Sequence, residues 1–312
     1  MHLIVSYAFG ADAACREVLA KLELPHLRAL LTALSAQPPG AGNARSLNTP
    51  DEHALAEALA LPRADGQIPW AALQAQQKQL SDGSGFWAYI SLCHWQLLAD
   101  QIVMRHWPIT DLSADHDQAL CLAMQPYLEE DGIKLCSDQP GRWLAQGPCF
   151  KQLLCASPER ALGRDLRDWM PSGTSAPALK RLQNEMQMLL HTHPANQERH
   201  AQGKVIVNSF WIHGNGGLPA GYLLPAEQAL TEHRLRAAAL AQDWPAWGQA
   251  WQAIDATAIK ALCEELARGR AVELTLCGER RAQSWRSQRQ SAWQNLCSRL
   301  FSKPVVHALE AL

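Results

Sequence analysis

The sequence contains no apolar run that approaches the roughly 18 to 20 residues needed for a helix to cross a bilayer. Its first residues carry a single histidine, His2, where a secretory signal peptide would carry Lys or Arg. Nine cysteines are present without any C-x-x-C pair, which fits reduced thiols better than a disulfide framework or a zinc ribbon. These absences predict a cytoplasmic protein without a membrane segment.

The fingerprints of nucleotide-binding loops are also missing. The glycines that follow His213 do not complete a G-x-G-x-x-G pattern, because Pro219 stands where the third glycine would be. A P-loop ending with Lys and Ser or Thr is absent as well. A dinucleotide-binding fold is therefore not favoured.

The composition is that of a globular protein, with 47% apolar and 19% charged residues in a chain of 312. The net charge of −2 hides an uneven distribution, since residues 1–150 carry 9 Lys and Arg against 16 Asp and Glu, and residues 151–312 carry 19 against 14. Charge complementarity between two lobes is the simpler explanation. The other is a basic surface that meets a small anionic ligand or an acidic protein partner.

Hydrophobic periodicity predicts strands that alternate with helices. The predicted strands lie at residues 2–7, 86–92, 94–104, 133–136, 142–145, 207–213 and 271–277. The predicted helices run to Lys21 from the cap Asp12, from Pro25 to Leu34, from the cap Asp51 to about Leu61, around 118–128, and from 179 to Pro194. The C-terminal third is otherwise helical, and Trp247 and Trp251 are predicted to lie in the core.

The order of these elements favours the α/β class, with one mixed, mostly parallel sheet covered by helices and a helix-rich C-terminal third. A single domain over residues 1–312 is expected. If the chain forms two lobes, the loop at 170–177 is the predicted boundary, because it is rich in Pro, Ser and Gly.

The stretch VNSFWIHGNGG, residues 207–217, offers more polar and aromatic groups than a strand followed by a structural turn requires. Its glycines serve either such a turn or a ligand-facing loop. The long helix before it carries amides opposite its apolar stripe. The predicted ligand-binding residues are Asn184, Gln187, His191, Asn208, Ser209, Trp211, His213 and Asn215.

Three further groups invite a functional interpretation, and each has a simpler structural one. His191, His193 and His200 lack the H-x-x-x-H spacing of a zinc site, and His193 is more simply the end of the apolar helical stripe. The acidic segment Asp115–Asp117 begins a capping box with Gln118. No metal site is predicted from these groups.

The third group is the basic C-terminal tail, in which arginines interleave with tryptophans, a composition that suits nucleic acid. The arginines are Arg280, Arg281, Arg286 and Arg289. Trp285, Trp293, Leu296 and Leu300 fall on one face of a predicted helix, which favours a core position for the tryptophans and a solvated rim of arginines. Nucleic-acid binding is therefore not the favoured function.

Four pieces of the chain resemble the RpfE-type regulatory proteins of proteobacteria. They are LPHLRALL at 24–31, RLQNEMQMLLHTHPANQER at 181–199, NSFWIHGNGG at 208–217 and LTLCGERRA at 274–282. Proteins of this type are often described as similar to cofactor-independent phosphoglycerate mutase. The resemblance implies an alkaline-phosphatase-like α/β fold and two divalent metal ions.

The first strand lacks the metal-binding aspartate that a catalytic member of this group would have. Such enzymes place Asp-Gly at its end, whereas this chain continues as Ala8-Phe9-Gly10, with Asp12 displaced. Two metal ions need about six carboxylate or imidazole ligands, and the sequence does not assemble them.

We therefore expect a regulatory protein, non-catalytic or weakly catalytic, that binds a small anionic ligand or a protein partner. No cofactor is predicted. The alternative is a metal-dependent phosphoglycerate mutase or phosphatase that acts on a small phosphorylated metabolite, with divalent metal ions as its cofactors. A second alternative is nucleic-acid binding through the basic C-terminal helix.

Overall fold

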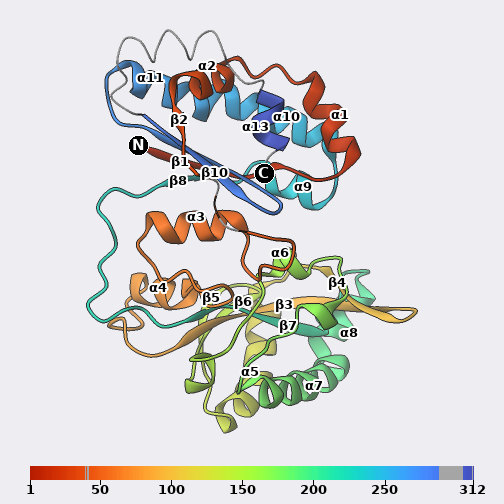
Figure 1. Cartoon of the computed structure of the whole chain (residues 1–312). Helices are drawn as coiled ribbons and strands as arrows, with labels where there is room; N and C mark the ends of the chain where they lie inside the picture. Colours follow the sequence, from red (N-terminus) through yellow and green to blue (C-terminus); the bar gives the residue numbers. More distant parts are fainter. Residues whose placement is uncertain (39, 41, 288–304, 311) are drawn as a thin grey trace. The chain divides into compact units, whose positions relative to one another are not determined.

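The structure, a computed structural model, describes residues 1–38, 40, 42–287, 305–310 and 312 (Figure 1). The chain divides into two compact units, which are described separately. Unit 1 comprises Met1–Ala60 and Leu224–Leu312, and unit 2 comprises Leu61–Leu223. The loop at 170–177 lies inside unit 2, where Leu154 and Ser172 exchange two backbone hydrogen bonds. The organisation of the chain as a single domain stays a prediction.

The described strands of unit 1 form one sheet with the order β2-β10-β9-β1-β8. β1 is parallel to both of its neighbours, β8 and β9, whereas β10 is antiparallel to β9 and to β2. The strands are β1 His2–Phe9, β2 Ser35–Ala36, β8 Leu230–Glu232, β9 Glu273–Gly278 and β10 Ala282–Arg286.

Helices lie on both faces of this sheet (Figure 1). Leu3 and Val5 of β1 pack into a core with Leu27, Trp251 and Leu262 from the helices of one face. On the other face α3 contacts β1 and β9. The helices are α1 Ala13–Lys21, α2 Pro25–Ala33, α3 Pro50–Ala58, α9 Arg236–Leu240, α10 Trp244–Ile254, the π-helix η3 Asp255–Ile259, α11 Lys260–Ala267 and α13 Val305–Glu310.

Two tryptophans of α10 hold the end of β1. Trp247 and Trp251 are fully buried, which confirms their predicted core position. Their Nε1 atoms donate to the carbonyl oxygens of Tyr7 and Ala8, at 2.9 and 3.2 Å. Tyr7 has a φ of 57°, a left-handed conformation that costs a non-glycine residue about 1 kcal/mol or more. The indole donors therefore stabilise a strained backbone directly after Ser6.

The helix starts of unit 1 follow capping rules, with one correction. Asp12 caps α1 as predicted, since its carboxylate accepts a hydrogen bond of 2.7 Å from Ala14 N–H. The cap of α3 is Thr49 and not Asp51. Pro50 fits the first helical position, where no N–H is needed, so the cap falls two residues earlier than predicted.

The start of α2 is capped from a distant part of the chain. No side chain beside this helix accepts its first N–H groups, and Asp255 of η3 does so instead. Its two oxygens accept from the backbone N–H of His26 at 3.2 Å and of Leu27 at 2.7 Å. The segment 24–31, one of the pieces behind the family resemblance, is thus anchored to η3.

The described strands of unit 2 pair only in antiparallel fashion. The order is β4-β3-β6-β5, and β7 pairs with β3. The strands are β3 Trp87–Leu98, β4 Gln101–His106, β5 Lys134–Gln139, β6 Arg142–Gln146 and β7 Ser209–Gly216.

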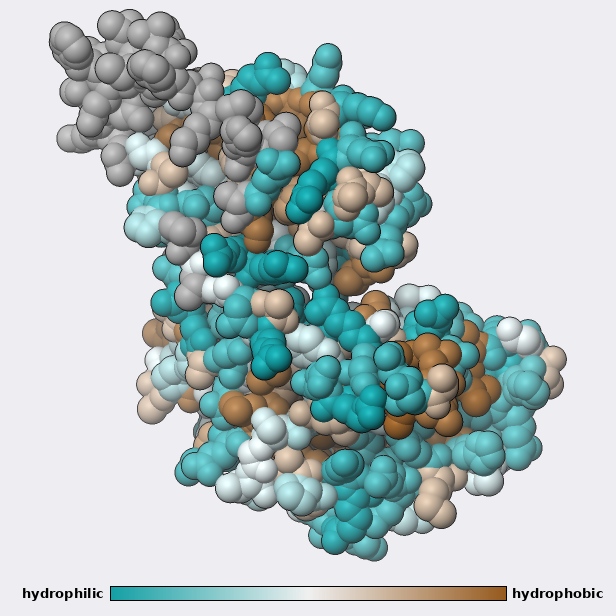
Figure 2. Space-filling view, turned by 45° about the vertical axis from the view of Figure 1, so that its right-hand side comes forward, coloured by the Kyte–Doolittle hydropathy of each residue, from teal (hydrophilic) through white to brown (hydrophobic). Residues whose placement is uncertain are grey.

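The two faces of this sheet have different coverings. Ile90 and Phe210 pack against Leu120 of α5 and Met186 of α7, whereas Tyr89 packs with the alanines of α4. Near the end of the β3–β4 hairpin, apolar side chains reach the surface of unit 2 (Figure 2). The helices are α4 Trp70–Gln77, α5 Ala114–Glu130, η1 Pro148–Phe150, α6 Pro158–Ala161, η2 Leu166–Asp168, α7 Ala176–Thr192 and α8 Pro194–Ala201.

The α/β class and the helix-rich C-terminal third are confirmed. The single, mostly parallel sheet needs a correction, because the described strands form separate sheets and their only parallel pairs are those of β1 with β8 and with β9. The hydrophobic pattern of a strand does not encode the direction of its neighbour, which explains the error. No helix within the described ranges is long and apolar enough to span a bilayer.

The role of α10 gives a first test. Trp251→Ala removes a fully buried indole and its hydrogen bond to Ala8, so we expect the free energy of unfolding of unit 1 to fall by about 3–5 kcal/mol. Urea unfolding followed by circular dichroism measures this. Met188→Ala is the control, because this side chain is 75% exposed and its loss should change stability by less than about 0.5 kcal/mol. Equal effects of the two substitutions would contradict the assignment.

Candidate functional site

β7, the strand at the centre of the predicted site, is buried along its whole length. It runs antiparallel to β3, with Trp211 opposite Ser91 and His213 opposite Tyr89. Because side chains alternate along a strand, these four side chains share one face of the sheet, the face covered by α4. The structure thus brings part of the predicted site together.

The glycines after His213 form a β-bulge inside the strand. From Tyr89 to Trp87 β3 advances by two residues, while β7 advances by three, from His213 to Gly216. Gly214 has a φ of 61°, and a Cβ atom there would lie 2.9 Å from the ring of Tyr89. The predicted turn at the end of the strand is therefore corrected to a bulge, which glycine permits by adopting a positive φ.

Asn208 acts as a substitute strand partner. Its Oδ1 accepts from the backbone N–H of Trp95 and its Nδ2 donates to the carbonyl oxygen of Trp95, both at 2.7 Å. A side-chain amide has the same donor and acceptor as a peptide group, so it continues the pairing of β3 where β7 begins. Both functional groups of this side chain are used within the protein.

Two amides of α7 bond to the outer edge of β7. Gln183 donates 2.6 Å to the carbonyl oxygen of Phe210, and Gln187 donates 3.0 Å to the hydroxyl of Ser209. A buried backbone carbonyl without a partner would cost about 1–3 kcal/mol, so these bonds stabilise the strand. Gln187 and Ser209, both predicted site residues, lie together as a structural pair.

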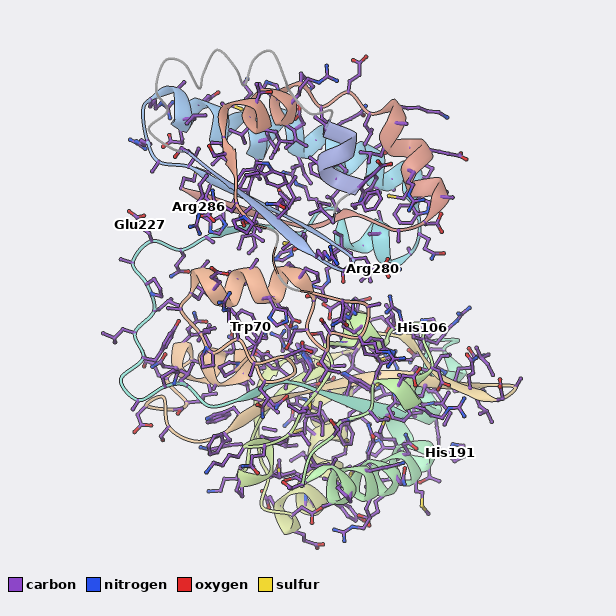
Figure 3. All side chains as sticks on the ribbon, viewed as in Figure 1. Trp70, His106, His191, Glu227, Arg280 and Arg286 are labelled. Atoms are coloured by element: carbon purple, nitrogen blue, oxygen red, sulfur yellow. The ribbon has the colours of Figure 1, made fainter. Side chains whose placement is uncertain are left out.

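Asn184 and His191 lie apart from the other predicted residues. Both side chains are exposed on α7, and Figure 3 shows His191 on the outside of this helix. The apolar stripe of α7, on which Gln183 also lies, faces the sheet. Asn184 and His191 lie on another side of the helix, which is exposed to solvent.

Trp211 and Asn215 bond to the segment that follows η1. Trp211 Nε1 donates 2.8 Å to the carbonyl oxygen of Ala156, and Asn215 Nδ2 donates 2.6 Å to that of Leu153. The Oδ1 atom of Asn215 is buried and has no hydrogen-bond partner among the described residues.

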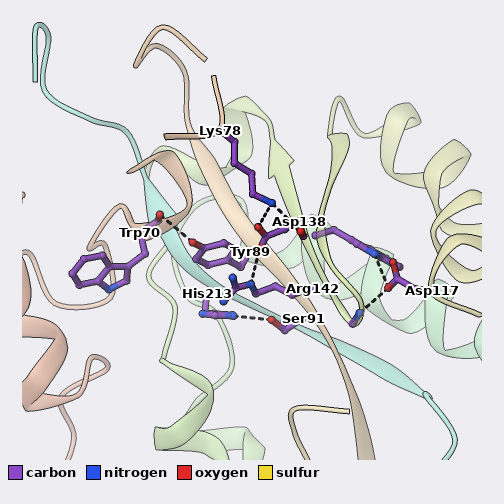
Figure 4. Close-up of polar contacts among 10 residues, drawn as sticks. Trp70, Lys78, Tyr89, Ser91, Asp117, Asp138, Arg142 and His213 are labelled. Atoms are coloured by element: carbon purple, nitrogen blue, oxygen red, sulfur yellow. Dashed lines mark hydrogen bonds and ion pairs between the residues drawn. The ribbon is translucent and has the colours of Figure 1, made fainter. Parts of the chain in front are cut away.

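His213 is a buried titratable group of this face (Figure 4). Its Nε2 lies 2.9 Å from the hydroxyl of Ser91, and its ring centroid lies 5.2 Å from that of Tyr89. Burial, with a further contribution from the charge of Arg142, lowers its pKa to about 3. The imidazole is therefore neutral at physiological pH.

Next to His213 lies a charged group that the sequence patterns did not predict. Asp138, with 3% of its side chain exposed, accepts from Lys78 Nζ and from Arg142 Nε, both at 2.6 Å. Asp138 and Arg142 are four residues apart on the β5–β6 hairpin, which is a weak signal. Lys78 lies 60 residues away in the sequence and gives no local signal at all.

Unit 1 contains a second polar cluster, also absent from the predicted site. The hydroxyl of Ser6, which is fully buried, donates 2.8 Å to Asp51 Oδ2 and lies 3.1 Å from His233 Nδ1. Ser6 follows Val5, the last β1 residue that pairs with β8, and His233 follows the last residue of β8. Ligand sites of α/β sheets lie at such carboxyl ends of parallel strands.

The divalent metals implied by the family resemblance do not fit this donor set. Among the described residues, no group of three or more His, Cys, Asp or Glu side chains could hold a metal ion. In the unit 1 cluster Ser6 contributes only a neutral hydroxyl, which donates to Asp51 and lies within bonding distance of His233. One carboxylate and one imidazole fall short of the roughly six ligands that two metal ions need.

The histidine and aspartate residues that were considered as metal ligands or acid–base groups in the sequence include helix caps and a buried hydrogen-bond acceptor. His193 does not end the stripe of α7 but caps α8, its Nδ1 accepting from Ala195 N–H at 3.2 Å. The N-cap of α5 is Ser113 and not Asp115. Asp117 is buried and accepts a hydrogen bond of 3.0 Å from Trp143 Nε1.

The predicted C-terminal helix is wrong where the structure describes it. Ala282–Arg286 is strand β10, and Trp285 is buried in the core of unit 1. Arg286 Nε pairs with Glu273 Oε1 at 2.9 Å, across the β9–β10 ladder. The pattern misled because a tryptophan suits a strand as well as a helix. The remaining tail residues of this prediction, Arg289, Trp293, Leu296 and Leu300, lie outside the described residues.

Comparison with known proteins gives partial sequence similarity. No family model matches the chain. It is 36% identical over 62 residues, 20% of its length, to a protein from Geobacter sulfurreducens named probable 2,3-bisphosphoglycerate-independent phosphoglycerate mutase. It is 25% identical over 125 residues, 38% of its length, to the 2,3-bisphosphoglycerate-independent phosphoglycerate mutase of Methanosarcina barkeri. The matches span only 16% and 31% of these relatives.

Two solved structures are similar at a low level. The cofactor-independent phosphoglycerate mutase from Thermoplasma acidophilum gives a TM-score of 0.38 at 13% identity, over 100% of this chain and 99% of that one. The PH0037 protein from Pyrococcus horikoshii gives 0.46 at 14% identity, over 92% and 87%. In sequence, the chain is thus related over part of its length to cofactor-independent phosphoglycerate mutases.

Two asparagines of the predicted site are expected to differ in their contribution to stability, because Asn208 is hydrogen-bonded to the backbone and Asn184 is exposed. Asn208→Ala leaves the N–H and C=O of Trp95 without their partner, so we expect a loss of about 1–3 kcal/mol in the free energy of unfolding. Asn184→Ala removes an exposed side chain of α7 and should change stability by less than about 0.5 kcal/mol. Thermal and urea unfolding of the two variants measure the difference, and similar stabilities would refute it.

The pKa of His213 predicts a loss of stability in acid. The pKa is 6.5 in the unfolded chain and about 3 in the folded one. Between these pH values the unfolded state binds one more proton than the folded state. The free energy of unfolding therefore decreases as the pH is lowered, by up to about 1.4 kcal/mol per pH unit. Urea unfolding at several pH values below neutrality should show a shallower dependence for His213→Asn than for the wild type. Identical slopes would contradict the assigned pKa.

Proposed function

We propose that the protein is a regulatory relative of cofactor-independent phosphoglycerate mutase, which binds a small anionic ligand or a protein partner and performs no metal-dependent phosphoryl transfer. The partial sequence similarity to two such mutases supports the relationship. The resemblance of segments 181–199 and 208–217 to RpfE-type proteins supports the regulatory role.

One observation carries the non-catalytic part of this proposal. At the carboxyl end of β8 the neighbouring β1 residue is Ser6, a buried hydroxyl that hydrogen-bonds to Asp51 and lies within bonding distance of His233. A divalent ion prefers carboxylate oxygens, whose charge offsets its own. A hydroxyl supplies no such charge, and it occupies the two neighbours that would otherwise be ligands.

The described part of the basic tail gives no support to nucleic-acid binding. Trp285 packs in the core, and the side chain of Arg286 pairs with Glu273. The aromatic surface that would stack on bases is therefore not present at Trp285.

The proposal is tested by measuring metal binding and turnover together. Isothermal titration with MnCl₂ and a coupled assay of 3-phosphoglycerate conversion in the presence of Mn²⁺ should show no stoichiometric binding and no turnover above the protein-free reaction. Binding of about two Mn²⁺ per chain with turnover that Asp51→Asn and His233→Ala both abolish would establish the mutase instead. The exposed Arg181→Lys serves as a matched variant that should behave as the wild type.

A further inference from the structure

The α4 face of the unit 2 sheet gathers polar side chains from four strands (Figure 4). The register places Arg142 of β6 beside Ser91 of β3, and Tyr89 of β3 beside His213 of β7. Asp138 reaches the same group from β5. These residues come from distant parts of the chain, so their proximity is a property of the fold.

Two β-bulges flank this group. Asp138 is the extra residue of the β5–β6 ladder, between Ser137 and Gln139. The other bulge is that of β7, which follows His213 directly. Bulges re-aim side chains and occur next to functional sites more often than elsewhere.

The charges in the group do not balance. Asp138 is almost completely buried and is shared by two cations, Lys78 and Arg142, whose side chains are 33% and 31% exposed. One carboxylate offsets one of the two positive charges. The group therefore keeps one net positive charge next to a buried region, where an anion would gain more than in bulk water.

The guanidinium of Arg142 is held in a fixed orientation with free donors. It bonds to Asp138 through Nε alone, and its Cζ lies 4.5 Å from the centroid of the Tyr89 ring. Among the described residues, no hydrogen bond engages its two terminal nitrogen atoms. A guanidinium fixed in this way presents a planar two-donor edge, which matches the two oxygens of a carboxylate.

His213 adds a polar but uncharged neighbour. One ring nitrogen is engaged with Ser91, and burial keeps the imidazole neutral by lowering its pKa to about 3. A charged imidazolium would raise the net charge of the group to two and favour a dianion. Because the ring is neutral, the net charge of the Lys78–Asp138–Arg142 group stays at plus one, which favours a ligand with a single negative charge.

We propose that Arg142, assisted by Lys78 and His213, binds a small monoanionic carboxylate on the α4 face of unit 2. The site names the chemical class of ligand for the binding role proposed above and rests on that role. A failure of the carboxylate site can be distinguished from a failure of the proposed function, because carboxylate binding is measured without metal and without turnover.

The test is a titration of the full chain with sodium acetate, followed by NMR of ¹⁵N-labelled arginine side chains and indole groups at constant ionic strength. We expect saturable shifts of the Arg142 Nε–H resonance, and about tenfold weaker binding by Arg142→Lys, which keeps the charge but loses the two-donor edge. Lys78→Met, which removes a cation and keeps the length of the side chain, should weaken binding as well.

The control is Arg181→Lys in the same unit, where an exposed arginine pairs with Asp131 at 3.1 Å. Its affinity for acetate should equal that of the wild type. Dispersed amide spectra of every variant establish that it is folded. Absence of a saturable shift at Arg142, equal weakening by Arg181→Lys, or tighter binding of inorganic phosphate than of acetate would each overturn the proposal.

Discussion

The burial of β7 is the constraint on which unit 2 depends. A strand without solvent on either side must satisfy its backbone groups internally, and among the described strands only β3 pairs with it. Just before β7, the amide of Asn196 exchanges hydrogen bonds of 2.6 and 2.8 Å with the backbone of Val207. Together with the amides of α7, these bonds fix β7 and hence the face on which His213 meets Arg142. Two of the four pieces behind the family resemblance, 181–199 and 208–217, are thus joined by hydrogen bonds within unit 2.

In unit 1, tryptophan side chains provide hydrogen bonds to backbone carbonyl groups at the end of β1. The indoles of Trp247 and Trp251 donate to the carbonyl oxygens of Tyr7 and Ala8 near the end of β1, and Tyr7, which has a positive φ, directly follows Ser6. Ser6 forms a hydrogen-bonded cluster with Asp51 at a position where α/β sheets bind ligands. Its chemistry is that of a neutral hydroxyl rather than of a carboxylate.

Much of the fold follows from local pattern, and the sites do not. The first strand, the cap of α1 and the long stripe of α7 are readable because each is decided by neighbours within a few residues. Trp285 was misplaced because a strand and a helix both bury a tryptophan. The bulge at Gly214, the pair Asn208–Trp95 and the group around Asp138 depend on contacts between distant segments. Single-sequence periodicity carries no information about such contacts.

The most direct measurement for the whole account is anomalous diffraction from crystals soaked with MnCl₂ and sodium acetate, collected at the manganese absorption edge. The account predicts no anomalous peak at Asp51 and His233, and acetate density against the terminal nitrogens of Arg142. Manganese bound by the carboxylate of Asp51 and the imidazole of His233 would contradict the proposed absence of a metal centre and with it the central claim.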